Sequence, residues 1–144
     1  MRYDPRLASV PGYVGECLTS VPKHYGIAID PLTGHVWVSG SDGYACELDP
    51  ETGQVLEING QPCCYDQGGG YPAQDIAIDG RGHVWIAQAH GTRVFHLAPD
   101  PTNPGRYYTV VDPLSGADCV DGFNRCTGVA VDRHGRIWVS EEKG

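Results

Sequence analysis

Residues 26–40 read GIAIDPLTGHVWVSG, and two closely similar stretches follow, DIAIDGRGHVWIAQ from Asp75 and GVAVDRHGRIWVSE from Gly128. The starts of the three stretches are separated by 49 and 53 residues. A phrase that recurs at a nearly constant period is typical of a repeat protein. This period suits the small four-stranded sheet that forms one blade of a β-propeller.

Each repeat contains the signals of two strands joined by a tight turn. In the first repeat, the apolar residues 27–29 are followed by Asp30 and Gly34, which favour a turn, and then by the strand-forming residues 36–38. No segment shows apolar residues at helical spacing, so the sequence predicts an all-β chain. Third and fourth strands are expected in both complete repeats, at Tyr44–Leu48 and Gln54–Ile58 and at Arg93–Leu97 and Tyr107–Val111.

The repeats predict three blades' worth of sequence, with one blade divided between the two ends of the chain. Residues 26–74 and 75–127 are expected to form complete blades. Residues 128–144 would supply the first two strands of the divided blade, and residues 1–25 its third and fourth strands.

Three blades are fewer than a propeller usually contains, and uncovered terminal blades would expose apolar faces and strand edges. We therefore expect the chain to associate with itself. The simplest assembly is a homodimer that closes a twofold symmetric ring of about six blades. The alternative is that these residues are part of a longer propeller.

The composition is typical of a compact protein with an acidic surface. Hydrophobic residues make up 40% of the 144 residues, and the formal net charge is −8. This negative charge argues against nucleic acid and against an anionic membrane as partners. No apolar run reaches the length of a membrane span, and the first residues lack the apolar stretch of a secretory signal.

Six cysteines are many for a chain of this length. Cys46 falls within an expected third strand, whereas Cys17, Cys63, Cys64, Cys119 and Cys126 are expected in loops before an innermost strand. An even number of cysteines in loops favours disulfides and an extracellular or periplasmic location. The leading candidate pair brackets a short loop and consists of Cys119 and Cys126. A zinc site is the competing interpretation, although no CxxC pair occurs.

The repeats resemble those of the NHL and virginiamycin B lyase group of β-propellers. The resemblance rests on HYGIAIDPLTGHVWVSG, residues 24–40, and its two echoes, and the repeats cover nearly the whole chain. It implies a propeller fold but says little about activity, because the group includes lyases, lactonase-like hydrolases and binding scaffolds. Its lyases use His and Glu residues with a divalent metal on the face around the central channel.

On this chain, the resemblance would place that face at the loops after the second strands and before the first strands. The candidate catalytic residues there are His24, His90 and Glu141. The candidate ligands for a divalent metal, Mg²⁺ or Ca²⁺, are His24, His90, Asp42 and Glu142. The alternative is that these residues are polar loop residues that face water.

The remaining histidines and the tryptophans are expected to have structural roles. His35 and His83 share one repeat position on the opposite face, His96 lies in a third strand, and His134 lies in a turn. Each repeat also places a tryptophan at the same position, where a blade core is expected: Trp37, Trp85 and Trp138.

Two functions are compatible with these observations. The first is a structural or binding scaffold that associates with itself and has no assigned catalytic activity. The second is a metal-assisted lyase or hydrolase acting at the channel face. We favour the scaffold because a chain with a divided blade is a poor location for a solitary active site. The sequence contains no phosphate-binding glycine loop, no GxSxG or HExxH motif and no EF-hand loop, and it does not identify a small-molecule ligand.

Overall fold

The computed structural model describes residues 24–66, 71–89, 93–110, 119–121 and 125–142, with the backbone alone for 119–121. Within these ranges the chain forms antiparallel β-strands and no helix, so the expected all-β class is confirmed. Accordingly, the described residues include no helix long and apolar enough to cross a membrane.

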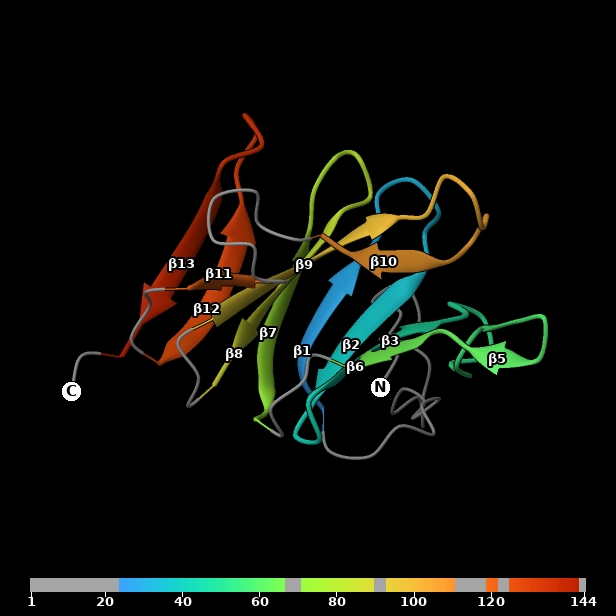
Figure 1. Cartoon of the computed structure of the whole chain (residues 1–144), viewed down its shortest axis with the longest axis horizontal. Helices are drawn as coiled ribbons and strands as arrows, with labels where there is room; N and C mark the ends of the chain where they lie inside the picture. Colours follow the sequence, from blue (N-terminus) through green and yellow to red (C-terminus); the bar gives the residue numbers. More distant parts are fainter. Residues whose placement is uncertain (1–23, 67–70, 90–92, 111–118, 122–124, 143–144) are drawn as a thin grey trace, which may run out of the picture.

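Apart from the small β4–β5 pair, the strands form three successive sheets, which we call blades 1, 2 and 3 (Figure 1). Blade 1 has the order β1-β2-β3-β6, formed by His24–Ile29, Val36–Gly40, Tyr44–Leu48 and Cys64–Asp66. Blade 2 has the order β7-β8-β9-β10, formed by Ala73–Ile78, Val84–Gln88, Arg93–Pro99 and Tyr107–Thr109, and β11 (Cys119–Asp121) pairs with the other half of β9. Blade 3 contains β12 (Cys126–Val131) and β13 (Ile137–Glu141).

The first strands of the three blades lie next to one another, with β7 between β1 and β12 (Figure 1). The strands approach so closely that a Cβ atom on Gly26 would lie 2.8 Å from the Cα atom of Asp75. Asp75 also links blade 2 to blade 3, because its carboxylate accepts a hydrogen bond from the backbone N–H of Val129 at 3.0 Å. Small residues and one half-buried acceptor thus allow the blades to pack face to face.

The largest hydrophobic core lies between blades 1 and 2. Its centre is Trp37, which is fully buried, stacks on the ring of Tyr65 at 5.6 Å and meets the edge of the Tyr107 ring at 4.9 Å. Blade 2 contributes aliphatic side chains, including Ile76 and Ile86. Each blade therefore buries its apolar surface mainly against the next blade.

The expectation that all three tryptophans are buried is right for Trp37 but wrong for Trp138. Trp85 is half-buried and stacks on His96 of the third strand, with ring centroids 3.8 Å apart. Trp138 is 60% exposed, because the described residues of blade 3 include no third strand that covers it. Its indole N–H donates a hydrogen bond to Asp132 at 3.1 Å.

The fourth strand of blade 1 differs from the expectation at Gln54–Ile58. Val55 forms only an isolated bridge to Leu48, and the paired fourth strand is β6. Between them, β4 (Glu57–Ile58) and β5 (Gln61–Pro62) form a small separate hairpin. The physical reason is the Asn59-Gly60 turn, in which both residues have positive φ angles of 54° and 73°, a favoured geometry for a two-residue hairpin.

The structure pairs Cys46 with Cys64 in a disulfide across neighbouring strands, with Cα atoms 4.1 Å apart. The expected pair of Cys119 and Cys126 is not formed, since Cys126 is a free, buried thiol. The backbone of Cys119 pairs with that of Phe95 in blade 2. Cys126 begins the first strand of blade 3, and its side chain lies in the apolar cluster between blades 2 and 3. Burial, with a smaller contribution from the charge of Glu141, raises the pKa of Cys126 to about 11.

We expect loss of the Cys46–Cys64 disulfide to lower the free energy of unfolding by about 2–4 kcal/mol, because the bridge restricts the unfolded chain. Urea denaturation of the wild type and of the Cys64→Ala variant measures this difference. A Glu-specific protease should cut after Glu51 and Glu57 and leave a linked pair of peptides that only reduction separates. The link should persist in the Cys63→Ala variant. A link that survives in the Cys64→Ala variant and disappears in the Cys63→Ala variant would contradict the assignment.

Candidate functional site

The residues expected on the channel face lie at one end of their blades. His24 begins β1 opposite Gly40, and Glu141 ends β13 opposite Cys126. Asp42 lies in the turn after β2, where its carboxylate accepts a hydrogen bond from the N–H of Tyr44 at 3.4 Å.

The other members of the expected site have local partners or lie outside the described residues. Glu142 forms an ion pair with Arg125 at 3.1 Å. His90 lies outside the described residues. In the part of the chain that the structure describes, no three His, Cys, Asp or Glu side chains are placed to hold a metal ion. The catalytic and metal-binding assignments on this face remain predictions.

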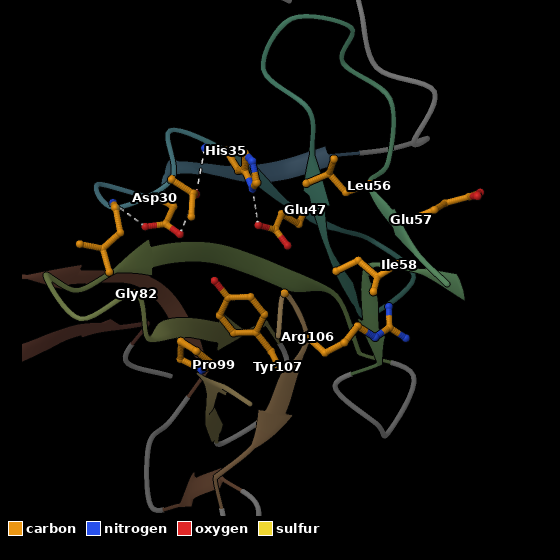
Figure 2. A pocket seen from close by; sticks show the side chains of 13 residues that line it. Asp30, His35, Glu47, Leu56, Glu57, Ile58, Gly82, Pro99, Arg106 and Tyr107 are labelled. Atoms are coloured by element: carbon orange, nitrogen blue, oxygen red, sulfur yellow. Dashed lines mark hydrogen bonds and ion pairs between the residues drawn. The ribbon is translucent and has the colours of Figure 1, made fainter. Parts of the chain in front are cut away.

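A groove of about 420 Å³ opens at the opposite end of blades 1 and 2 (Figure 2). Leucine, isoleucine and proline side chains form its apolar walls, namely Leu32, Leu56, Ile58 and Pro99. Its polar lining comes from the β1–β2 turn, from β3 and from the start of β10, and consists of Asp30, Thr33, His35, Glu47, Arg106 and Tyr107. Residues far apart in the sequence thus converge on one concave surface.

Glu47 lies at the centre of this groove. It projects from β3, is only 4% exposed, and its Oε1 atom is 2.7 Å from Nδ1 of His35. Burial raises the pKa of Glu47, although the hydrogen bond to His35 opposes the rise. The second oxygen, Oε2, has no hydrogen-bond partner among the described residues. Figure 2 shows the carboxylate pointing toward the open space beside Tyr107.

Asp30 is a second buried carboxylate in the groove, but its oxygens already have donors. The N–H of Leu32 donates to Oδ1 at 2.8 Å, and the hydroxyl of Thr33 donates to Oδ2 at 2.9 Å. Burial, followed by the negative charges of Glu47 and Asp30, raises the pKa of Tyr107 above its ordinary value, so this phenol stays protonated.

Arg106 is the arginine of the groove, and its guanidinium group hydrogen-bonds to the β4–β5 hairpin. Its NH1 group donates to the carbonyl oxygen of Pro62 at 2.9 Å and to that of Gln61 at 3.3 Å. The guanidinium also lies 6.0 Å from the centre of the Tyr65 ring. Arg106 therefore holds the hairpin against β10.

Blade 2 carries a different pair at the two positions that His35 and Glu47 occupy in blade 1. His83 replaces His35, and His96 replaces Glu47 as the cross-strand neighbour of the tryptophan. Nδ1 of His83 lies 2.8 Å from Nε2 of His96. Burial, reinforced by the nearby His83, lowers the pKa of His96 to about 4, so this imidazole is neutral at pH 7.

We expect the free energy of unfolding to fall as the pH drops from 6.5 to about 4. The upper limit is the ordinary pKa of a histidine, and the lower limit is the pKa of His96 in the folded protein. Over this range the unfolded chain binds more protons at His96 than the folded chain does. After allowance for partial solvent exposure, the loss should be about 1–3 kcal/mol. Thermal denaturation across this range measures it. The stability of the His96→Asn variant should depend less on pH than that of the wild type, whereas the His134→Asn variant should behave as the wild type does. An equal dependence of stability on pH in His96→Asn and the wild type would contradict the assignment.

The outward face of β1 is a further candidate surface, because it leaves apolar side chains uncovered. Ile27 and Ile29 are 65% and 67% exposed. The residues that occupy the position of Ile27 in the other blades, Ile76 and Val129, are only 4% and 7% exposed, because each packs on the preceding blade. We call Tyr25, Ile27 and Ile29 the β1 face.

Sequence reasoning overlooked the groove, although one signal was present. Glu47 is the one charged residue within the otherwise uncharged strand Tyr44–Leu48, and a buried charge in such a strand calls for a partner. Tyr107 carried no such signal, because it reaches the groove only when blade 2 packs against blade 1.

Comparison with known proteins shows the fold and no more. No family model matches the chain, and no curated protein matches it in sequence. A solved structure of virginiamycin B lyase from Staphylococcus aureus superposes with a TM-score of 0.52 at 17% identity, and a catalytically inactive form of that enzyme with quinupristin superposes with 0.52 at 18%. Each match covers 83% of this chain and 34% of the other chain. The chain therefore has a β-propeller fold and spans about a third of the length of these structures.

Proposed function

We propose that this chain is a structural and binding scaffold that associates with a second copy of itself, so that two chains close a propeller ring. The observation that carries the proposal is the exposure of the β1 face. Ile27 is 65% exposed, whereas Ile76 at the same repeat position is 4% exposed. An apolar position that is buried by the preceding blade in both other repeats is a surface on which another blade fits.

Blade 3, at the other end of the row of three blades, supplies a matching surface. Trp138 is 60% exposed, whereas Trp37 at the same position is completely buried. In addition, β13 pairs only with β12 among the described strands, while the equivalent strands β2 and β8 each pair with a third strand. A strand edge that no described strand covers can accept a further strand.

The two uncovered surfaces correspond to the two sides of contacts that the chain already makes. Ile76 of β7 packs in the cluster that contains Trp37 of blade 1. Val129 of β12 packs in the cluster that contains Trp85 of blade 2. By the same geometry, Ile27 of a second copy would pack on Trp138. Two such contacts related by a twofold axis produce a closed ring of about six blades.

The Cys46–Cys64 disulfide supports an extracellular or periplasmic location for this scaffold, because structural disulfides persist in oxidising compartments. The disulfide joins the third and fourth strands of blade 1 and so fastens the outer edge of that blade. A scaffold held by a disulfide is suited to such a compartment.

Size-exclusion chromatography with light scattering tests the proposal. A dimer has twice the chain mass of 15.5 kDa. We expect this dimeric mass at micromolar concentration, together with a β-rich circular dichroism spectrum. A folded monomer under the same conditions would contradict self-association.

A further inference from the structure

We propose that the groove between blades 1 and 2 binds a small organic cation, consisting of a primary ammonium group on an apolar body, with the ammonium held by Glu47. The proposal is independent of self-association, because all the lining residues belong to one chain.

The first argument is the incomplete hydrogen bonding of a buried carboxylate. Glu47 is 4% exposed, and its Oε1 atom is satisfied by His35 at 2.7 Å. Its Oε2 atom has no partner in the described ranges and points into the groove (Figure 2). Oε2 is open to the groove, and a charged donor there would form a stronger hydrogen bond to the carboxylate than a neutral donor does. A donor from a ligand would satisfy this oxygen.

The second argument concerns the sign of the ligand's charge. The NH1 group of Arg106 is used by the carbonyl oxygens of the β4–β5 hairpin. With the buried carboxylates of Glu47 and Asp30 in the lining, the groove offers mainly acceptors and negative charge. An ammonium group has three donors and a positive charge, and it therefore suits this surface.

The third argument concerns the rest of the ligand. Leu32, Leu56, Ile58 and Pro99 form apolar walls around a volume of about 420 Å³. Such walls favour a compact hydrocarbon or aromatic body. The ring of Tyr107 also lines the groove and can contact a cation over its face.

Isothermal titration calorimetry with phenethylamine tests the proposal, with phenethyl alcohol and 3-phenylpropionate as neutral and anionic comparison compounds. We expect phenethylamine to bind at least about tenfold more tightly than the alcohol, and the carboxylate not to bind. The Glu47→Gln variant keeps the shape of the side chain and should weaken amine binding at least about tenfold. The Glu51→Gln variant removes the same charge from an exposed position outside the groove and should bind the amine as the wild type does.

Three outcomes would overturn the proposal. They are absence of amine binding at millimolar concentration, equal affinity for the amine and the alcohol, and unchanged affinity in a folded Glu47→Gln variant. A chemical-shift map that places the amine outside the groove would do so as well. A monomeric wild type that binds the amine would support this proposal while contradicting self-association, so the two failures are distinguishable.

Discussion

Replacement of Trp37 by alanine should lower the free energy of unfolding by about 3–5 kcal/mol. Trp37 is completely buried between blades 1 and 2 and contacts the rings of Tyr65 and Tyr107. The smaller side chain would leave a cavity and remove both ring contacts, and the surrounding strands cannot close fully around it. Urea denaturation followed by circular dichroism measures the loss without relying on tryptophan fluorescence.

Trp138→Ala is the matched control, because it removes the same side chain at the same repeat position. Trp138 is 60% exposed, so its replacement should cost less than about 1 kcal/mol in the monomeric state. The comparison is made in the Ile27→Asp background described below, in which association is expected to be absent. Equal losses in the two variants would contradict the assigned difference in burial.

The parts of the fold that could be predicted from the sequence are those that repeat. The first and second strands of each blade are joined by a turn whose aspartate side chain accepts local hydrogen bonds. In blade 1, Asp30 accepts from the N–H of Leu32 and the hydroxyl of Thr33, whereas in blades 2 and 3 the aspartate accepts two backbone N–H groups. Asp79 accepts from Arg81 at 2.8 Å and His83 at 3.0 Å, and Asp132 accepts from His134 and Arg136 at the same distances. Local turn chemistry of this kind is written in consecutive residues and is therefore visible in the sequence.

The outer strands could not be predicted equally well, because they differ between blades. Blade 1 inserts the β4–β5 hairpin before its fourth strand, and β9 of blade 2 pairs with both β10 and β11. The Cys46–Cys64 disulfide depends on the register between β3 and β6, which has no counterpart in another repeat. The Asn59-Gly60 pair was the local signal that could have located the hairpin.

The groove was harder to predict because its members meet only after two blades have packed. Asp30 ends β1, Glu47 lies in β3, and Tyr107 begins β10 of the next blade. No spacing rule joins residues that lie in different repeats. The repeat alignment did contain one clue, since Glu47 and His96 occupy one position with very different chemistry.

Replacement of Ile27 by aspartate should abolish self-association while leaving the fold intact. The side chain is 65% exposed within one chain, so a carboxylate there would remain hydrated in the monomer. In the proposed ring the same carboxylate would be buried against Trp138 without a partner, at a cost of several kcal/mol. A loss of that size corresponds to a reduction of at least about 100-fold in the association constant.

Sedimentation velocity over a range of concentrations distinguishes the two states. The wild type should sediment as a dimer and the Ile27→Asp variant as a monomer with an unchanged circular dichroism spectrum. Tyr108→Asp is the matched control, because Tyr108 is 47% exposed on β10, outside the β1 face and away from β13, and its replacement should leave the dimer intact. A dimeric Ile27→Asp variant would show that association uses another surface. A monomeric Tyr108→Asp variant would show that the loss of association is not specific to the β1 face, and the proposed pairing of Ile27 with Trp138 would then have to be abandoned.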